Sequence, residues 1–212
     1  MNIKIIFTIN TLVLFFMSIY MIYTYRKKPY NQTIKFLTYF IVLHSIGFVL
    51  FILRNQIPDF LSIIFANTLF AIGTLFLYFA IKSLLQLNIE WHGRYLIPLI
   101  TYFIGFVVFT YISYNTTTRI VIYYSYCVLF LSPSAWFLWF KSSSEFKTFD
   151  RFSAILFLSI IMLFLWVIIK ASFLNLHTYY FSNSNIFMML SNMVMMLLII
   201  WTVLCVKIRI KN

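Results

Sequence analysis

The side chains that could carry acid–base or metal chemistry are few in this sequence of 212 residues. The four acidic residues all fall between apolar runs or at their ends: Asp59, Glu90, Glu145 and Asp150. Ion-coupled carriers usually keep carboxylates inside the membrane, where a charge is costly and is retained for function. The His-Glu-x-x-His pattern, which would place two zinc ligands and a general base on one helix, is absent. We therefore expect no catalytic residues, no metal site and no cofactor, and we expect that this chain is not itself an enzyme.

His44 is the most informative single residue because it lies at the middle of an apolar run, close to the expected centre of the bilayer. An imidazole without hydrogen-bond partners in apolar surroundings costs on the order of a few kcal/mol. Asn67 and Thr68, at a similar expected depth in the next apolar run, are candidate partners. One interpretation is a hydrogen bond between two helices, worth about 1 kcal/mol. The others are contact with a ligand or a haem, and no special role.

A short polar segment, residues 54–59, separates the second and third apolar runs. Asp59 fits the N-cap or the first turn of the following helix, where a carboxylate favours the positive end of the helix dipole. Pro58 supplies the turn, and Arg54 is placed to pair with Asp59. The segment is either a structural turn or part of an extracellular or periplasmic ligand mouth. The candidate ligand-binding residues are Arg54, Asp59, His44 and Asn67.

The composition determines which elements must position these residues. Apolar residues make up 63% of the chain and charged residues only 9%, whereas a soluble domain carries about 25% charged residues. This is too little polar surface to cover a globule in water, so the apolar surface must face lipid.

Seven continuous apolar runs reach the length of about 20 residues that a helix needs to cross a bilayer. Helices are favoured over strands because a helix satisfies its own backbone hydrogen bonds in lipid. We predict an all-α polytopic membrane protein, a seven-transmembrane-helix bundle that forms a single domain over residues 1–212. The predicted helices are approximately 5–25, 36–53, 60–81, 95–114, 119–140, 152–172 and 185–206.

The basic residues predict the orientation of these helices. The chain carries 16 Lys and Arg and a net charge of +12. The poorer side of the predicted membrane holds Lys4, Arg54, Arg119 and Lys170, and the remaining basic residues all fall on the other side. Cytoplasmic loops carry the excess of Lys and Arg, so we expect the N-terminus outside and the C-terminus in the cytoplasm. Such charge attracts anionic lipid head groups, and nucleic acid is not an expected partner.

Residues 53–67 (LRNQIPDFLSIIFAN) are followed by Gly73 and by the basic segment 80–84 (AIKSL). This pattern resembles the N-terminal membrane region of bacterial diguanylate cyclases and sensor histidine kinases. Those regions often show an Arg, an Ile-Pro-Asp-aromatic turn and a Ser, then an Asn and a Gly in the next helix, and end in a basic patch. Outside residues 53–84 the resemblance rests on helix number and topology.

The resemblance implies a sensory input region in the bacterial inner membrane, whose last helix continues into a cytoplasmic coiled coil and a catalytic domain. This chain departs from that pattern at residues 207–212 (KIRIKN), because no Gly-Gly-Asp-Glu-Phe motif or kinase motif is present. We expect a signal-input module that acts through its last helix on a cytoplasmic output domain or protein. Its further expected partners are membrane lipids, a small-molecule ligand and a second copy in a homodimer.

The alternative function is a small membrane transporter or pore. Pro133, between Ser132 and Ser134, is the feature that favours it, because a proline can kink a helix that lines a cavity. The missing interior carboxylates weigh against this alternative. A repeat of four residues, Thr-Tyr-Phe-Ile at 38–41 and 101–104, is too short to indicate the internal symmetry of transporters.

Overall fold

The computed structural model describes residues 3–89, 93–143, 145–173, 200, 201 and 203, and all regular secondary structure in these ranges is helical. The prediction of an all-α fold is confirmed for this part of the chain. The elements are α1 (Ile3–Lys27), α2 (Gln32–Ile52), η1 (Phe60–Phe65), α3 (Ala66–Leu84), η2 (Gly93–Tyr95), α4 (Leu96–Val107), η3 (Val108–Ile112), α5 (Thr116–Phe140) and α6 (Lys147–Phe173). Elements η1 and η3 are π-helical turns that are continuous with α3 and α4.

Six helices in the described ranges are long and apolar enough to cross a membrane, which indicates a multi-pass membrane protein. They are Thr8–Lys27, Gln32–Ile52, Phe60–Leu84, Gly93–Ile112, Thr116–Phe140 and Lys147–Ser172. These six correspond to the first six predicted helices. The predicted seventh helix, 185–206, lies outside the described residues except for Ile200, Trp201 and Val203, which are helical.

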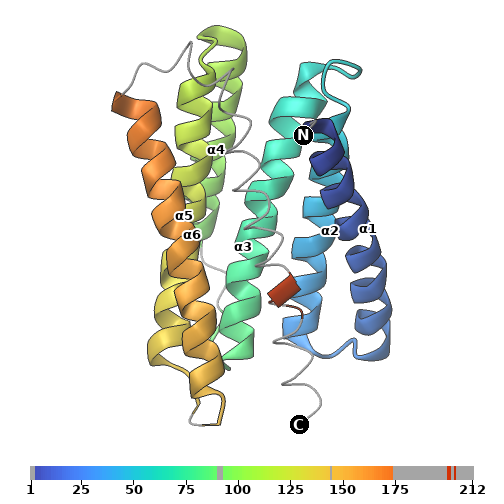
Figure 1. Ribbon diagram of the computed structural model, residues 1–212, viewed down its shortest axis with the longest axis vertical. Helices are drawn as coiled ribbons and strands as arrows, with labels where there is room; N and C mark the ends of the chain where they lie inside the picture. Colours follow the sequence, from blue (N-terminus) through green and yellow to red (C-terminus); the bar gives the residue numbers. More distant parts are fainter. Residues whose placement is uncertain (1–2, 90–92, 144, 174–199, 202, 204–212) are drawn as a thin grey trace.

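The helices run alternately up and down, and they form two groups of three (Figure 1). In the first group α2 packs between α1 and α3, and in the second α5 packs mainly against α6. The two groups meet chiefly where α3 contacts α5, with further contacts between α3 and α4. The centre of the bundle is therefore built around α3 and α5.

The outward surfaces of the helices are as apolar as the interior. Phe16 on α1 is 65% exposed, and Ile97 on α4 and Met162 on α6 are each 67% exposed. Large apolar side chains that are exposed on several faces would associate in water, but they are in their preferred environment against lipid chains. The exposed surface thus agrees with the membrane assignment drawn from composition.

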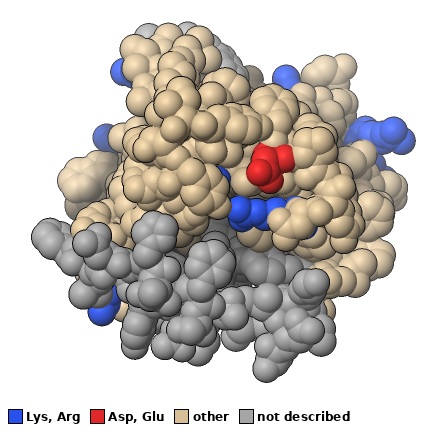
Figure 2. Space-filling view, turned by 90° about the horizontal axis from the view of Figure 1, so that it is seen from above, with Lys and Arg blue, Asp and Glu red and all other residues tan. Residues whose placement is uncertain are grey.

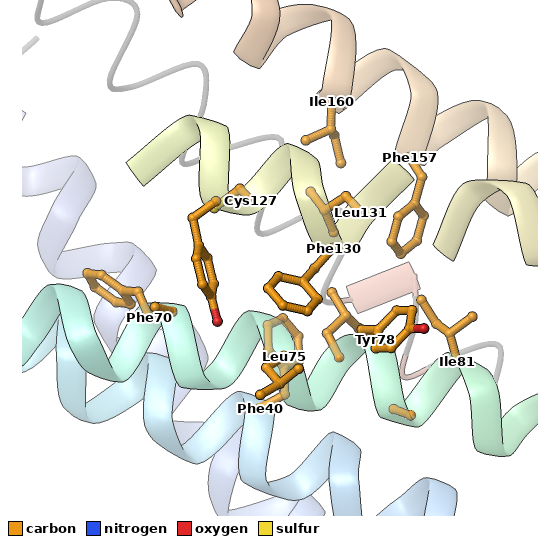
Figure 3. Close-up of a cluster of buried hydrophobic side chains, with 14 of the residues drawn as sticks. Phe40, Phe70, Leu75, Tyr78, Ile81, Cys127, Phe130, Leu131, Phe157 and Ile160 are labelled. Atoms are coloured by element: carbon orange, nitrogen blue, oxygen red, sulfur yellow. The ribbon is translucent and has the colours of Figure 1, made fainter. Parts of the chain in front are cut away.

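Aromatic side chains fill the space between α3 and α5 (Figure 3). The ring of Tyr78 on α3 lies 5.8 Å from that of Phe130 and 6.2 Å from that of Phe137, measured between centroids. Phe157 and Ile160 on α6 close the other side of α5. Such ring pairs contribute about 0.5–1.5 kcal/mol each beyond the area they bury.

Many hydroxyl side chains within the helices bond to the carbonyl one turn earlier on their own helix. In α3, for example, Thr74 Oγ1 donates to the Phe70 carbonyl at 3.0 Å, and in α5 Ser134 Oγ donates to the Phe130 carbonyl at 2.8 Å. This local bond removes the cost of placing a hydroxyl in an apolar interior. The same arrangement occurs at Ser18, Thr24, Thr38, Ser62, Thr68, Ser132, Ser153 and Ser159.

Two helices begin at asparagine N-caps. The Asn31 side chain accepts from the Ile34 amide at 3.0 Å, and the Asn115 side chain accepts from the Thr118 amide at 3.0 Å. Both asparagines have the extended backbone that an N-cap requires. These caps allow α2 and α5 to begin three or four residues before the predicted starts at 36 and 119.

The cap of α5 leads to a first prediction. We expect Asn115→Ala to lower the free energy of unfolding by about 1 kcal/mol, because the Thr118 amide loses its acceptor. The measurement is the SDS concentration that unfolds half of the protein in mixed micelles. Asn115→Ser is the matched control, since its hydroxyl can still accept. Equal midpoints for the alanine and serine variants would contradict the capping role.

Candidate functional site

The segment between α2 and α3 is a tight turn. The Leu53 carbonyl accepts hydrogen bonds from the amides of Gln56 at 2.9 Å and Ile57 at 3.2 Å. Asn55, at the tip, has a φ of 73°, a left-handed conformation that asparagine adopts more readily than most residues. The backbone of this turn is thus explained by its own hydrogen bonds, while its side chains are available for other roles.

Asp59 lies in the first turn of the helix that leads into α3, which confirms that part of the prediction. It is not an N-cap. Its φ and ψ of −57° and −31° are already helical, and its side chain makes no capping bond, whereas a capping side chain needs an extended backbone to reach the amides. No salt bridge joins Arg54 and Asp59, both of which lie in the described part of the chain, so the predicted ion pair is not formed.

His44 lies in α2 and is 1% exposed. Its Nδ1 is 3.0 Å from the Phe40 carbonyl oxygen. Because a carbonyl can only accept, Nδ1 carries the proton of the neutral ring and Nε2 presents a lone pair. Nε2 is buried and has no hydrogen-bond partner among the described residues. His44 therefore offers one unused acceptor inside the bundle.

Two glycines bring α2 and α3 together around His44. A Cβ atom added to Gly73 on α3 would lie 2.6 Å from Cε1 of His44, and one added to Gly47 on α2 would lie 2.6 Å from Cε1 of Phe70. Each helix thus places an aromatic ring over the glycine of the other. The two rings are 5.3 Å apart between centroids. We call His44, Gly47, Phe70 and Gly73 the α2–α3 ring–glycine contact.

Asn67 and Thr68 do not bind the imidazole, so the predicted partners of His44 are wrong. The Asn67 side chain donates to the Ile63 carbonyl at 2.6 Å, and Thr68 donates to the Ile64 carbonyl at 2.8 Å. The ring–glycine contact sets the register of α2 on α3 and places His44 opposite Gly73, six residues or about 9 Å further along α3 than Asn67.

The four sequence-predicted site residues therefore do not form one site. Arg54 and Asp59 lie in and after the turn, and His44 lies eight residues before the end of α2 at Ile52, about 12 Å along the helix axis. Asn67 lies between these levels, and its backbone carbonyl accepts from the Tyr102 hydroxyl on α4 at 3.2 Å. Whether any of the four binds a ligand stays a prediction.

Sequence reasoning missed a cluster at the same end of the bundle as the turn. Arg119, in the first turn of α5, is only 4% exposed. Its Nη1 donates to Thr110 Oγ1 at 3.4 Å and its Nη2 to Thr116 Oγ1 at 2.9 Å, while its guanidinium carbon lies 4.9 Å from the ring centroid of Tyr114. We call Thr110, Tyr114, Thr116 and Arg119 the Arg119 cluster. The available sequence signal was an arginine immediately after three threonines, 116–118.

A second contact that the sequence did not reveal lies at the opposite end of the bundle. Trp201, within the predicted seventh helix, donates its indole N–H to Ser153 Oγ on α6 at 2.8 Å. Its ring is 4.8 Å from that of Phe149 and 4.9 Å from that of Phe152, between centroids. Trp201 therefore contacts the first two turns of α6.

Within the described ranges, no three His, Cys, Asp or Glu side chains gather in the manner of a metal site. Two buried polar groups in these ranges could bind another molecule. They are the imidazole acceptor of His44 in the α2–α3 contact and the guanidinium of Arg119 in the Arg119 cluster. No family model, curated protein or solved structure matches this chain.

Proposed function

We propose that this protein is a membrane-embedded signal-input module that detects a small molecule and passes the signal through its C-terminal segment to a cytoplasmic output domain or protein. The observation that carries the proposal is the buried Nε2 of His44 in the α2–α3 ring–glycine contact, which has no hydrogen-bond partner in the part of the chain that the structure describes. A buried polar atom without a partner costs about 1–3 kcal/mol. A ligand or an altered helix packing that supplies a donor would recover this free energy, and a sensor needs two such states of comparable energy.

The arrangement of the helices supports this proposal. The two groups of three helices meet mainly through α3 and α5, so a change in the packing of α2 on α3 can shift one group relative to the other. Trp201 links such a shift to the C-terminal segment. It is hydrogen-bonded to Ser153 on α6, so it would move with the second group of helices. We propose that the end rich in Lys and Arg, where Trp201 contacts α6, faces the cytoplasm of a bacterial inner membrane.

The proposal is tested by fusing a diguanylate cyclase domain after Asn212 and measuring cyclic di-GMP formation in membranes. We expect Arg54→Ala and His44→Ala to change the output by roughly threefold or more, because residues that couple two sites shift the balance of states by about 0.5–2 kcal/mol. Lys170→Ala is the matched control, a basic residue at the same end as Arg54 that contacts Trp166.

Membrane content of each variant, measured by quantitative immunoblotting, separates a signalling defect from a loss of protein. If both Arg54→Ala and His44→Ala give the output of the unsubstituted fusion at equal membrane content, the sensory proposal is wrong. Accumulation of a labelled solute in proteoliposomes that contain the unfused protein would instead favour the transporter alternative.

A further inference from the structure

Arg119 carries a positive charge in a place that is unfavourable for it. Its guanidinium is buried in the first turn of α5, near the positive end of the helix dipole, where anions are stabilised and cations are not. Its hydrogen-bond partners are neutral hydroxyls, those of Thr110, Thr116 and Tyr114. Among the described residues no carboxylate forms an ion pair with it. A buried charge is normally retained only with an opposite charge beside it.

A second arginine, Arg54 in the α2–α3 turn, lies at the same end of the bundle (Figure 1). The pKa of the exposed Tyr114 hydroxyl is lowered by hydrogen bonds with Thr116 and Arg119, which outweigh a small opposing effect of burial, and further by the charges of Arg119 and Arg54. Tyr114 is thus within electrostatic reach of both guanidinium groups, one from the α4–α5 connection and one from the α2–α3 turn. Viewed onto this end, basic atoms lie in the interior of the face beside a small acidic spot (Figure 2).

The π-helical turn η3 helps to build this arrangement. Its backbone hydrogen bonds span more residues than those of an α-helix. The Ser113 amide donates to the Val108 carbonyl at 2.9 Å, and the Asn115 amide, just after the turn, donates to the Phe109 carbonyl at 3.1 Å. The turn places Thr110 against Arg119, while the Asn115 side chain caps α5. π-Helical turns are frequently found at functional sites. Arg119 is therefore held in place by hydroxyl groups that leave its charge without a counter-charge among the described residues.

We propose that Arg119 and Arg54 bind an oxyanion, the carboxylate or phosphate group of a small molecule or of a lipid head group, at the end of the bundle formed by the α2–α3 and α4–α5 connections. Guanidinium forks match the two oxygens of such groups in geometry and charge. The proposal rests on the sensory function proposed above and specifies the chemical class of the signal.

The test uses the full-length protein in a neutral detergent and measures its thermal unfolding by tryptophan fluorescence. Inorganic phosphate and acetate are titrated at constant ionic strength against chloride. We expect one or both to raise Tm saturably, by roughly 5–11 °C at about 100 times the Kd, while chloride does not. In a second arm, nanodiscs of anionic phosphatidylglycerol are compared with nanodiscs of zwitterionic phosphatidylcholine, both in phosphate-free buffer. A rise in that arm alone identifies a lipid head group as the source.

The variants decide whether the effect belongs to this site. We expect R119Q and R54Q to weaken the apparent affinity by roughly tenfold or more, and K170Q to bind as the unsubstituted protein does. If R119Q does not fold, R54Q decides, because it alters a half-buried turn residue. No stabilisation in either arm, or stabilisation that R54Q retains, would overturn the proposal. Signal output is not the readout, so failure of this site and failure of the sensory function are separate results.

Discussion

Replacing Gly73 with alanine is expected to lower the free energy of unfolding by about 2–3 kcal/mol, at the upper end of the cost of overpacking a core. The new methyl group would lie 2.6 Å from Cε1 of His44. The imidazole cannot move aside easily, because it is 1% exposed and is packed against the rings of Phe40 and Phe70. α2 and α3 must therefore separate. The measurement is the midpoint of SDS-induced unfolding in mixed micelles.

The other glycines provide controls for this prediction. A Cβ atom on Gly93 would have no neighbour within 4 Å, and one on Gly105 would meet only the side chain of Ile122, whose flexible tip is 3.0 Å away. Gly93→Ala should unfold at the same SDS concentration as the unsubstituted protein, and Gly105→Ala within about 1 kcal/mol of it. Adding His44→Ala to Gly73→Ala should abolish most of the Gly73 effect. An unchanged midpoint for Gly73→Ala alone would show that α2 and α3 are not in close contact here.

Trp201→Ala is expected to remove about 2–3 kcal/mol of stability and to disconnect the C-terminal segment from the bundle. Truncating a fully buried tryptophan to alanine lowers the free energy of unfolding by about 3–5 kcal/mol. Trp201 is half-buried, so the expected loss is smaller. The substitution removes its packing on Phe149 and Phe152 together with the hydrogen bond to Ser153. In the cyclase fusion, the output of Trp201→Ala should no longer respond to His44→Ala.

Two variants test whether this effect is specific. Ser153→Ala removes the hydrogen bond and leaves the rings in place, so it should cost only about 1 kcal/mol. Trp136→Ala truncates a tryptophan that is 59% exposed on the outer surface, and it should leave the coupling intact. If His44→Ala still alters the output in the Trp201→Ala background, the signal reaches the output by a route that bypasses α6.

The membrane class and the six described helices were predictable because bilayer crossing depends on apolar content summed over about 20 residues, which is a property of the sequence alone. The starts of the helices were predicted less well. α6 begins at Lys147 rather than at 152, and α2 begins at Gln32 rather than at 36. The first turns of these helices are polar, and in α2 the cap at Asn31 extends the helix beyond the apolar run.

The candidate site was less predictable because it depends on how helices pack. The burial of His44 followed from its place in an apolar run, but its neighbour depends on the register that Gly47 and Gly73 set between α2 and α3. The surroundings of Arg119 depend on a hydroxyl nine residues away across a connection, at Thr110. Neither relation appears as a periodic pattern within one helix.

The hydroxyl bonds to carbonyls on the same helix have a mechanical consequence. Because residues such as Ser18 and Ser134 satisfy their hydroxyls locally, a neighbouring helix can slide or rotate past them without breaking these hydrogen bonds. Cross-helix hydrogen bonds, such as the one from Thr33 Oγ1 on α2 to Ser83 Oγ on α3 at 2.9 Å, would hold two helices together at one level while they rotate about that point. Shear between helices would therefore break the few cross-helix hydrogen bonds and leave the local ones intact.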